Sequence, residues 1–435
     1  NKNFKRLKAQ LRMLSLKYLR ENKSDAIQGL AKRNFTDTAL IDQIISLDQK
    51  RRKTQSQLDE LLAEANTIAK QIGQLFKTGK ADEAQELKER SGEIKKQSKA
   101  LQEELQSTER ELQEARVQVP NIPKSIVPAG STEEDNEVVR NVGEIPTLME
   151  GALPHWELAK KYDLIDFDLG SKITGAGFTV YKGKGARLRR ALINYFLDHN
   201  TSAGYQETQV PHLVNEDSAY GTGQLPDKEG QMYHVTGDNL YLIPTAEVPL
   251  TNIYRNELLE ERQLPIALTG YTPCFRREAG SYGAHVRGLN RLHQFDKVEI
   301  VRFETPERSE AALEEMISHV ESLLKTLHLP YRILRLCGGD LGFTSALTYD
   351  FELFSTAQNK WLEISSVSTF ESYQAERLQL RYRTADGSKQ LVHTLNGSSL
   401  ALPRVLAALL ENCQTPEGII ILEDLMHYTG FKRID

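Results

Sequence analysis

Two long runs with coiled-coil spacing constrain this chain more than any other feature of its sequence. In both runs, mostly apolar or small side chains recur at alternating intervals of three and four residues, which places them along one side of an α-helix. The first run comprises Ile44, Leu47, Arg51, Thr54, Leu58, Leu61, Ala65, Ile68, Ile72 and Leu75. The second comprises Ala84, Leu87, Ser91, Ile94, Ser98, Leu101, Leu105, Thr108, Leu112 and Ala115. The spacing predicts two long helices between about residues 38 and 116.

A short break containing Gly79 separates the two runs, and no proline interrupts either of them. Pro120 and Pro123 follow the second run, where a helix is expected to end. A short break between two helices with matching seams predicts an antiparallel helical hairpin. At a rise of 1.5 Å per residue, each helix would be about 55 Å long. We therefore expect the hairpin to form a projecting arm.

The charges of this arm nearly cancel, although basic residues cluster at 50–53 and at Lys95, Lys96 and Lys99. Taken alone, these clusters fit either a solvated helix face or a surface that binds RNA. Pairing the two seams in antiparallel register predicts that residues 50–53 lie near 106–110, and that the three lysines lie opposite about 60–64. The basic residues would then form separate patches along the arm.

The composition limits the class of protein. A chain of 435 residues with 39% hydrophobic residues has enough apolar surface for two or three domains, and its net charge of −5 does not itself indicate a nucleic-acid partner. The three cysteines are far apart in the sequence and form no CxxC pair. This pattern favours a reducing compartment without a structural zinc. Because no apolar run approaches about 20 residues, we expect no membrane span.

The chain divides into four predicted regions. Residues 1–12, rich in basic side chains, form an extension before Met13 that is either an upstream addition or the remnant of a targeting peptide. Residues 13–119 hold the helical arm, 120–150 read as a linker, and 151–435 form the remaining domain. Within that domain we expect helices at 186–199, 309–327 and 400–412, and strands at 240–243, 391–395 and 419–422. These elements do not alternate as βαβ units, which predicts an α+β domain around a mostly antiparallel sheet.

Three stretches of the last region resemble, in order, the signature motifs of class II aminoacyl-tRNA synthetases. Residues 204–211 resemble motif 1, and residues 397–404 resemble motif 3. Motif 2 is represented by Phe275-Arg276-Arg277-Glu278 and, after a loop containing Gly280, Gly283 and Gly288, by residues 291–299. Three motifs in the family's order are far more specific than any one of them.

Further stretches at 243–247, 363–366 and 394–398 are similar to the seryl-tRNA synthetases within this class, as is the preceding hairpin. The resemblance covers residues 13–435 and fits the zinc-free form found in bacteria and organelles. It implies an enzyme that uses ATP to convert L-serine to seryl-adenylate and transfers the seryl group to the 3′ end of tRNA(Ser). It also implies a cytoplasmic homodimer, joined through motif 1, in which the arm of one subunit guides tRNA to the other.

The resemblance implies a catalytic set of Arg276, Glu363 and Arg404. Activation joins two anions, the serine carboxylate and ATP, so the site needs fixed cations and a metal ion more than a general base. Arg276 would bridge the carboxylate and the α-phosphate, while Arg404 would hold the terminal phosphates. Glu363 and Ser366 would present oxygen atoms to Mg²⁺, which prefers such ligands.

The implied ATP site also includes a base-binding part. Phe295 would stack on adenine, Glu278 would accept a hydrogen bond from its amino group, and Arg291 would lie near adenine or phosphate. The full set implied for ATP is Arg276, Arg277, Glu278, Arg291, Leu292, Phe295, Glu363, Ile364, Ser365, Ser366 and Arg404.

For serine, the resemblance implies Thr245, Ala246, Glu247, Arg276, Glu299, Asn396 and Ser398. A carboxylate suits the α-ammonium group, but the sequence leaves open which group binds the ammonium and which binds the hydroxyl. Two alternatives remain: an enzyme that passes an aminoacyl-adenylate to a carrier protein, and a non-catalytic coiled-coil scaffold. We expect His293 and Cys274, although near motif 2, to pack or orient neighbours rather than react.

Overall fold

The computed structural model describes residues 16–435 except 81 and 280–286, so the predicted extension 1–12 and part of the motif 2 loop lie outside the described residues. The described chain forms two compact units. One consists of residues 16–31 and 35–120, and the other of residues 32–34 and 121–435. Among the described helices, none is both long enough and apolar enough to cross a membrane.

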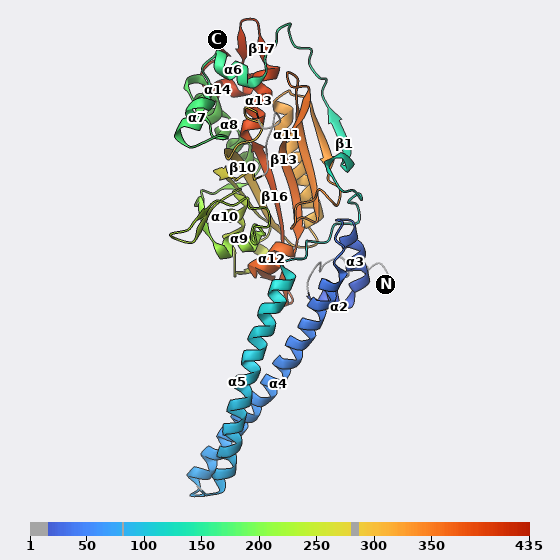
Figure 1. Ribbon diagram of the computed structural model, residues 1–435, viewed down its shortest axis with the longest axis vertical. Coiled ribbons are helices and arrows are strands. Elements are labelled where there is room, and N and C mark those ends of the chain that lie inside the picture. Colours follow the sequence, from blue (N-terminus) through green and yellow to red (C-terminus); the bar gives the residue numbers. More distant parts are fainter. Residues whose placement is uncertain (1–15, 81, 280–286) are drawn as a thin grey trace. The chain divides into compact units, whose positions relative to one another are not determined.

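The first unit is built on the predicted helical hairpin. Helix α4 (Thr38–Lys77) begins after Asp37, whose carboxylate accepts a hydrogen bond from Leu40 N and so caps the helix. Gly79, with a φ of +76°, turns the chain towards the short helix η1 (Asp82–Ala84) and the long helix α5 (Gln85–Arg116). Figure 1 draws α4 and α5 side by side, which confirms the predicted hairpin.

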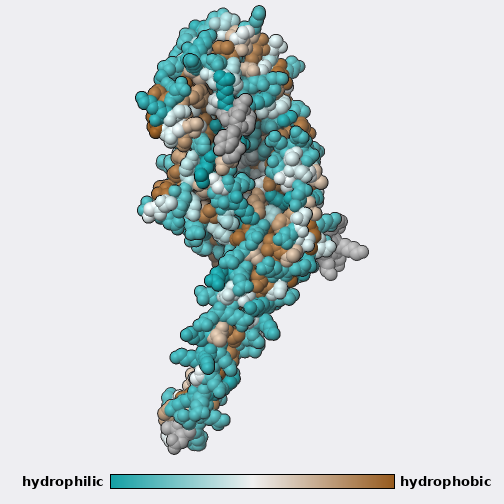
Figure 2. Space-filling view, in the orientation of Figure 1, coloured by the Kyte–Doolittle hydropathy of each residue, from teal (hydrophilic) through white to brown (hydrophobic). Residues whose placement is uncertain are grey.

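Every residue of the two predicted seams is buried or half-buried in this hairpin. Most of the intervening positions are exposed, and Figure 2 shows mainly hydrophilic side chains on the outer surface of the two helices. The hairpin is therefore held by a narrow apolar seam, with the helices otherwise solvated.

The predicted register of the hairpin was wrong by about one helical turn. Lys50 Nζ lies 3.3 Å from Glu104 of α5, outside the predicted range of 106–110. Glu64 pairs with Arg90 at 2.7 Å rather than facing Lys95, Lys96 and Lys99. Because both seams continue with the same spacing, a shift by one repeat still brings apolar side chains together, so the pattern alone does not determine the register.

The second unit contains an eight-stranded sheet in the order β1-β11-β12-β13-β16-β10-β9-β4. All neighbouring pairs are antiparallel except β4 with β9, which confirms the predicted α+β class. The strands are β1 (Glu137–Val142), β4 (Gln206–Glu207), β9 (Ile266–Phe275), β10 (Gln294–Glu304), β11 (Tyr331–Arg335), β12 (Leu347–Ser355), β13 (Lys360–Glu371) and β16 (His393–Ala401).

One face of this sheet carries the main core of the second unit. Helices α8 (Gly183–Ser202), α11 (Ser309–Thr326) and α13 (Leu402–Asn412) pack on it (Figure 1). Along β12, Leu347, Tyr349, Phe351 and Leu353 belong to this core, whereas Thr348, Asp350 and Glu352 line a cavity. Since side chains alternate along a strand, the cavity lies on the opposite face of the sheet.

A second apolar cluster lies at one end of the cavity face. It joins Val301 and Phe303 of β10 to Leu250 of α10 (Glu247–Asn252) and to Ala375 and Leu378 of α12 (Tyr373–Leu378). Helix α9 (Glu216–Thr222) packs on α10 and α12. These three helices cover part of the cavity face, so the polar side chains of the sheet gather in the part that remains open.

The remaining elements are short. They are α2 (Leu16–Glu21), α3 (Lys23–Ala31), η2 (Glu133–Asp135), α6 (His155–Lys161), β2 (Ile165–Asp166), α7 (Phe167–Ile173), β3 (Val180–Tyr181), β5 (Leu213–Asn215), β6 (His234–Val235), β7 (Leu240–Leu242), β8 (Leu258–Glu260), η3 (Glu261–Gln263), β14 (Arg381–Arg383), β15 (Lys389–Leu391), β17 (Gln414–Thr415), β18 (Gly418–Ile420), α14 (Glu423–Thr429) and β19 (Arg433–Ile434).

Several predicted boundaries differ from the structure. The helix predicted from residue 400 begins at Leu402, because Ala401 is still extended and Pro403 fits the first helical turn. The strand predicted at 391–395 is divided between β15 and β16, and that predicted at 419–422 is β18, one residue earlier at its start. The predicted linker 120–150 contains β1, a short edge strand whose three valines do not alternate with polar residues and so give no strand pattern.

Candidate active site

A single cavity of about 1260 Å³ in the second unit collects most of the residues that the sequence predicts for serine and ATP. Its floor is the polar face of the sheet, with Lys297 from β10, Asp350 from β12, and Asn396 and Ser398 from β16. Its rim includes Arg276, just after β9, and Arg404, in the first turns of α13. The strands thus bring together residues that are far apart in the sequence.

Two buried carboxylates lie at one end of this cavity: Glu247 lines it, and Glu299 lies directly behind its lining residues. Glu299 Oε2 lies 2.6 Å from Lys297 Nζ and accepts a hydrogen bond from Thr245 Oγ1 at 3.3 Å. Its Oε1 accepts a hydrogen bond from Asn396 Nδ2 at 3.2 Å. Burial raises the pKa of Glu299, although the charge of Lys297 opposes this effect. The carboxylate of Glu299 is therefore held in place by its contacts with Lys297, Thr245 and Asn396.

Glu247 is the second buried carboxylate at this end. Its Oε1 accepts a hydrogen bond from Gln374 Nε2 at 2.7 Å. Burial, together with the negative charge of Glu299, raises the pKa of Glu247 to about 7. One lysine faces two carboxylates here, so this end of the cavity is suited to a second cation.

Asn396 adds a buried acceptor to the same end. While its amide nitrogen donates to Glu299, its Oδ1 is buried and has no hydrogen-bond partner among the residues that the structure describes. An unpaired buried oxygen costs free energy unless a ligand supplies a donor. The two carboxylates and this oxygen are all acceptors, so this end of the cavity suits a small molecule with an ammonium or hydroxyl group.

Two arginines, Arg276 and Arg404, also line the cavity. Arg276 Nε donates to Pro244 O at 3.3 Å, and its guanidinium group lies 5.2 Å from the centre of the Phe295 ring. Arg404 Nε donates to Asn290 O at 3.0 Å, and its Nη1 donates to Glu363 O at 2.8 Å. Both guanidinium groups are held in position by main-chain carbonyls, and Arg404 Nη1 also lies 3.6 Å from Glu363 Oε2.

Arg276 covers one face of the Phe295 ring, so a nucleotide base could stack only on the other face. Glu278 and Arg291, which the sequence predicts near adenine, also line the cavity and lie 3.4 Å apart. Glu278 has a φ of +48°, an uncommon conformation for a residue other than glycine. The predicted base-binding residues are thus adjacent at one edge of the cavity.

Several side-chain oxygen atoms that could bind a metal ion lie close together beside Arg404. Ser366 Oγ donates to Glu363 Oε1 at 3.4 Å, and Asp350 lies opposite Ser366 in the adjacent strand. Asp350 Oδ1 is buried without a hydrogen-bond partner in the described part of the chain, and burial together with the charge of Glu363 raises the pKa of this carboxyl well above its usual range. These groups suit a hard divalent cation.

No group of three or more His, Cys, Asp and Glu residues in the described ranges could hold a metal ion by itself. Mg²⁺ differs from zinc in this respect, since it is commonly held by one or two protein oxygens together with substrate phosphates. The oxygen cluster at Glu363 fits that arrangement.

Two residues predicted for the site do not reach the cavity surface, and two others reach it only from the core. Leu292 and Ile364 line the cavity, although their side chains also belong to the main core. The side chain of Ala246 belongs to the second apolar cluster and does not line the cavity. Arg277 is exposed and does not line the cavity. Ser365 does line it, but its hydroxyl donates to Ser398 O at 2.5 Å and so joins two strands.

The structure adds three residues to which the sequence reading gave no role: Lys297, Asp350 and Gln374. Lys297 could have been found from strand alternation, because it lies two residues from Phe295, which was predicted for the site. Asp350 lies on β12, a strand from which no site residue was predicted. Gln374, on α12, has no such signal. His293 and Cys274 pack as expected: His293 stacks on Phe178, and Cys274 is fully buried.

Comparisons with known proteins agree with this geometry. Residues 13–123 match the seryl-tRNA synthetase N-terminal domain, and residues 233–413 match the tRNA synthetase class II core domain (G, H, P, S and T). The serine–tRNA ligase of Salinibacter ruber is 49% identical over 97% of this chain and 99% of that protein. That of Thermotoga maritima is 49% identical over 97% of this chain and 100% of its own length.

Solved structures show the same fold. The seryl-tRNA synthetase of Pyrococcus horikoshii, complexed with ATP, has a TM-score of 0.88 and 33% identity, covering 97% of this chain and 99% of that one. The cytoplasmic serine–tRNA ligase of Naegleria fowleri, in complex with AMP, has a TM-score of 0.85 and 28% identity, covering 98% of this chain and 99% of that one.

Proposed function

The chain belongs to the seryl-tRNA synthetase family, and from this premise we propose which residues perform each part of serine–tRNA ligation. The reaction has two steps. The carboxylate of L-serine first attacks the α-phosphorus of ATP, forming seryl-adenylate and releasing pyrophosphate. A terminal hydroxyl of tRNA(Ser) then takes the seryl group, and AMP leaves. The observation that carries the proposal is the meeting of Arg276, Glu363, Arg404 and Glu247 in one cavity. Glu299 lies directly behind this cavity and contacts its lining residues Lys297, Thr245 and Asn396.

Serine binds at the end of the cavity that holds the two carboxylates. Its α-ammonium group lies against Glu247, because Glu299 is already paired with Lys297 and Glu247 retains the uncompensated negative charge. The hydroxyl of serine is bound by Glu299 and Ser398, and Asn396 Oδ1 accepts from one of the two substrate donors. An analogue that lacks the hydroxyl leaves buried partners unpaired, which supports rejection of alanine by roughly 10⁴-fold.

Arg276 lies between the serine end and the ATP end of the cavity. Its planar guanidinium group is suited to contact the serine carboxylate and an α-phosphate oxygen at once, which brings the two anions together. Arg404 holds the terminal phosphates, the part of ATP that leaves as pyrophosphate. Adenine stacks on the face of Phe295 that Arg276 does not cover.

Glu363 and Ser366 are the proposed protein ligands of Mg²⁺, and the unpaired Oδ1 of Asp350 supports an adjacent cation. When bound with ATP, Mg²⁺ would neutralise phosphate charge. The contribution of these protein residues is to keep oxygen atoms aimed at the phosphate end.

The arm is the proposed tRNA-binding element. Lys95, Lys96 and Lys99 are exposed on α5, which supports contacts with the RNA backbone. Motif 1 contains β4, an edge strand of the sheet, which supports a homodimer formed there. The proposed compartment is the cytoplasm, because all three cysteines are unpaired thiols.

The experiment that tests this proposal is serine-dependent exchange of labelled pyrophosphate into ATP, measured beside transfer of serine to tRNA. Exchange together with transfer to tRNA supports the ligase. Exchange without transfer to tRNA indicates an enzyme that supplies another acceptor, such as a carrier protein. The absence of both indicates a non-catalytic protein.

A further inference from the structure

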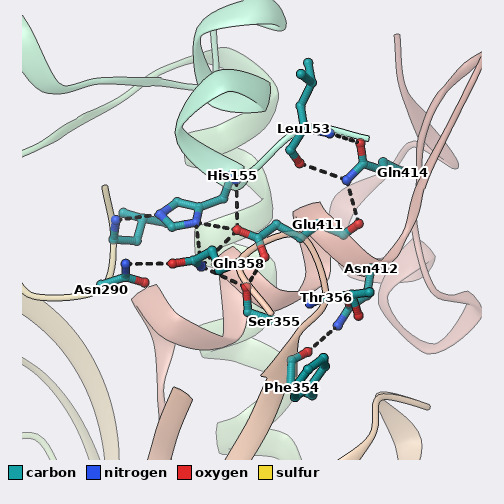
Figure 3. Close-up of polar contacts among 11 residues, drawn as sticks. Leu153, His155, Asn290, Phe354, Ser355, Thr356, Gln358, Glu411, Asn412 and Gln414 are labelled. Carbon is teal, nitrogen blue, oxygen red and sulfur yellow. Dashed lines mark hydrogen bonds and ion pairs between the residues drawn. The ribbon is translucent and has the colours of Figure 1, made fainter. Parts of the chain in front are cut away.

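A buried polar network lies behind Arg404, outside the residues assigned above to substrates. Its centre is Glu411, on the same helix as Arg404, and the network also includes His155, Ser355 and Gln358 (Figure 3). Glu411, His155 and Ser355 are fully buried. Such a network is costly unless every member is paired, so its arrangement is closely specified.

The carboxylate of Glu411 accepts four hydrogen bonds. Its Oε1 accepts from the main-chain nitrogen of His155 at 2.9 Å, from His155 Nδ1 at 2.7 Å and from Gln358 Nε2 at 3.0 Å. Its Oε2 accepts from the hydroxyl of Ser355. These four donors stabilise a buried carboxylate that has no salt bridge to a lysine or arginine in the described part of the chain.

His155 also links this network to the main chain that follows the motif 2 loop. Its Nε2 accepts a hydrogen bond from Leu289 N at 2.8 Å, so Nδ1 carries the proton donated to Glu411. The imidazole ring fits there because residue 288 is glycine: a Cβ atom at this position would lie 2.2 Å from His155 Nε2. The ring therefore contacts the backbone directly.

Two further contacts link helix α6 to the same segment. The guanidinium group of Arg287 lies 4.6 Å from the centre of the Trp156 ring, and its Nη2 lies 3.4 Å from Glu157 Oε1. Three consecutive residues of α6, starting at His155, thus contact residues 287–289.

The segment then reaches the nucleotide end of the cavity through Asn290. The side chain of Asn290 donates to Gln358 Oε1 at 2.9 Å, which joins it to the network. Its main-chain oxygen accepts from Arg404 Nε at 3.0 Å. Asn290 therefore connects the buried network to the guanidinium group that is proposed to hold the terminal phosphates.

We propose that His155 is a positioning residue for ATP: by holding Leu289 N, and with Gln358 holding Asn290, it sets the carbonyl that orients Arg404. This inference rests on the proposed role of Arg404 in phosphate binding. His155 itself does not touch substrate. Loss of its acceptor nitrogen frees the main chain at 289–290 and lets the guanidinium group of Arg404 leave its binding position.

Two substitutions of His155 test separately the hydrogen bonds that its ring makes with Glu411 and with Leu289 N. His155→Asn keeps an amide donor near the position of Nδ1 but has no acceptor that reaches Leu289 N, whereas His155→Gln places an amide oxygen near the position of Nε2. In pyrophosphate exchange, we expect His155→Asn to raise KM for ATP about tenfold, the scale of one lost buried hydrogen bond, with KM for serine unchanged. His155→Gln should raise KM for ATP less.

His393 provides a matched control, since it is also buried and its Nδ1 makes a 2.8 Å hydrogen bond with Ser309 Oγ, among residues that do not line the cavity. His393→Asn should lower the melting temperature without changing either KM. If His155→Asn does not fold, Gln358→Leu replaces it, because this change removes the partner of the Asn290 side chain.

The same variants are also compared by calorimetric titration of the full chain with ATP, without serine or tRNA. Tenfold weaker ATP binding by His155→Asn supports the positioning role even if the wild type exchanges no pyrophosphate, a result that would overturn only the proposed function. A folded His155→Asn protein with wild-type affinity and KM for ATP overturns the positioning role. So does an equal rise in KM for ATP and for serine.

Discussion

The side-chain amide of Gln374 donates a 2.7 Å hydrogen bond to Oε1 of Glu247. Gln374 is itself oriented by Thr394 Oγ1, which donates to its Oε1 at 2.7 Å. All three side chains are buried. The amide thus aims the carboxylate that is proposed to bind the ammonium group of serine, although it lies far from Glu247 in the sequence.

Replacing Gln374 with leucine should weaken the binding of serine. The change keeps the volume but removes the donor that positions Glu247, so we expect KM for serine to rise about tenfold while KM for ATP stays unchanged. Steady-state pyrophosphate exchange measures both constants. Gln379→Leu, at an exposed position just after the same helix, is the control and should change neither. An equal effect on both substrates would mean that Gln374 supports the fold rather than Glu247.

Glu247→Gln should make the protein without substrates more stable, and more so at higher pH. The pKa of Glu247 is raised to about 7 in the folded protein, from an ordinary value of 4.5. Ionisation therefore opposes folding: the cost is absent below the ordinary pKa, grows as the pH rises from 4.5 to about 7, and is fully present above that. At pH 8 we expect a gain in the free energy of unfolding of about 1–3 kcal/mol.

Denaturant unfolding at pH 5 and pH 8 checks this expectation, with a smaller gain at pH 5. The same variant should lose serine activation, since a neutral amide cannot pair with the ammonium group. A gain of the same size at both pH values would show that the carboxylate of Glu247 does not titrate between them.

Arg276 should be required for serine activation because its planar guanidinium group can contact two anions, and not only because it is positively charged. Arg276→Ala should lower the rate of pyrophosphate exchange by at least about 10²-fold, the scale of losing one preorganised donor in a transition state. Arg276→Lys keeps the charge but cannot contact two anions with one planar group, so it should also be impaired. Exchange at the wild-type rate in Arg276→Ala would remove this residue from the mechanism.

Neutralising Lys95, Lys96 and Lys99 together should weaken the binding of tRNA. Contacts between these exposed ammonium groups and phosphates release counterions, so the slope of affinity against salt concentration should become shallower. The constants for serine and ATP should not change. The matched control replaces the same residues with arginine, which keeps the charge and should keep the slope. Superimposable salt dependences for wild type and neutral variant would identify this cluster as a solvated helix face.

The arm is the part of the fold that local sequence predicts best. Its seams repeat over many turns, and Ile44, Leu58 and Ile94 are buried as the spacing requires. The register of the two helices could not be derived in the same way, because the repeat of each seam leaves several alignments nearly equivalent. Long-range ion pairs such as Arg90 with Glu64 distinguish between them.

Motif resemblance located the cavity, but strand geometry decides which residues of a motif reach it. Lys297 lines the cavity from β10 and Glu299, two residues later, pairs with it, whereas Ala246 belongs to an apolar cluster and Arg277 is exposed. The contacts of Gln374 and His155 could not be predicted, because their partners lie on other elements and no local periodicity marks them. Such residues become evident only when the chain is folded.

The cavity is proposed to activate serine for transfer to tRNA. The most direct test is pyrophosphate exchange by the wild-type protein with serine, alanine or threonine, followed by transfer of labelled serine to tRNA(Ser). We expect exchange with serine, exchange with alanine lower by roughly 10⁴-fold, and stable attachment of serine to tRNA. Equal exchange with alanine and serine, or no exchange with serine by the folded protein, would contradict this proposal.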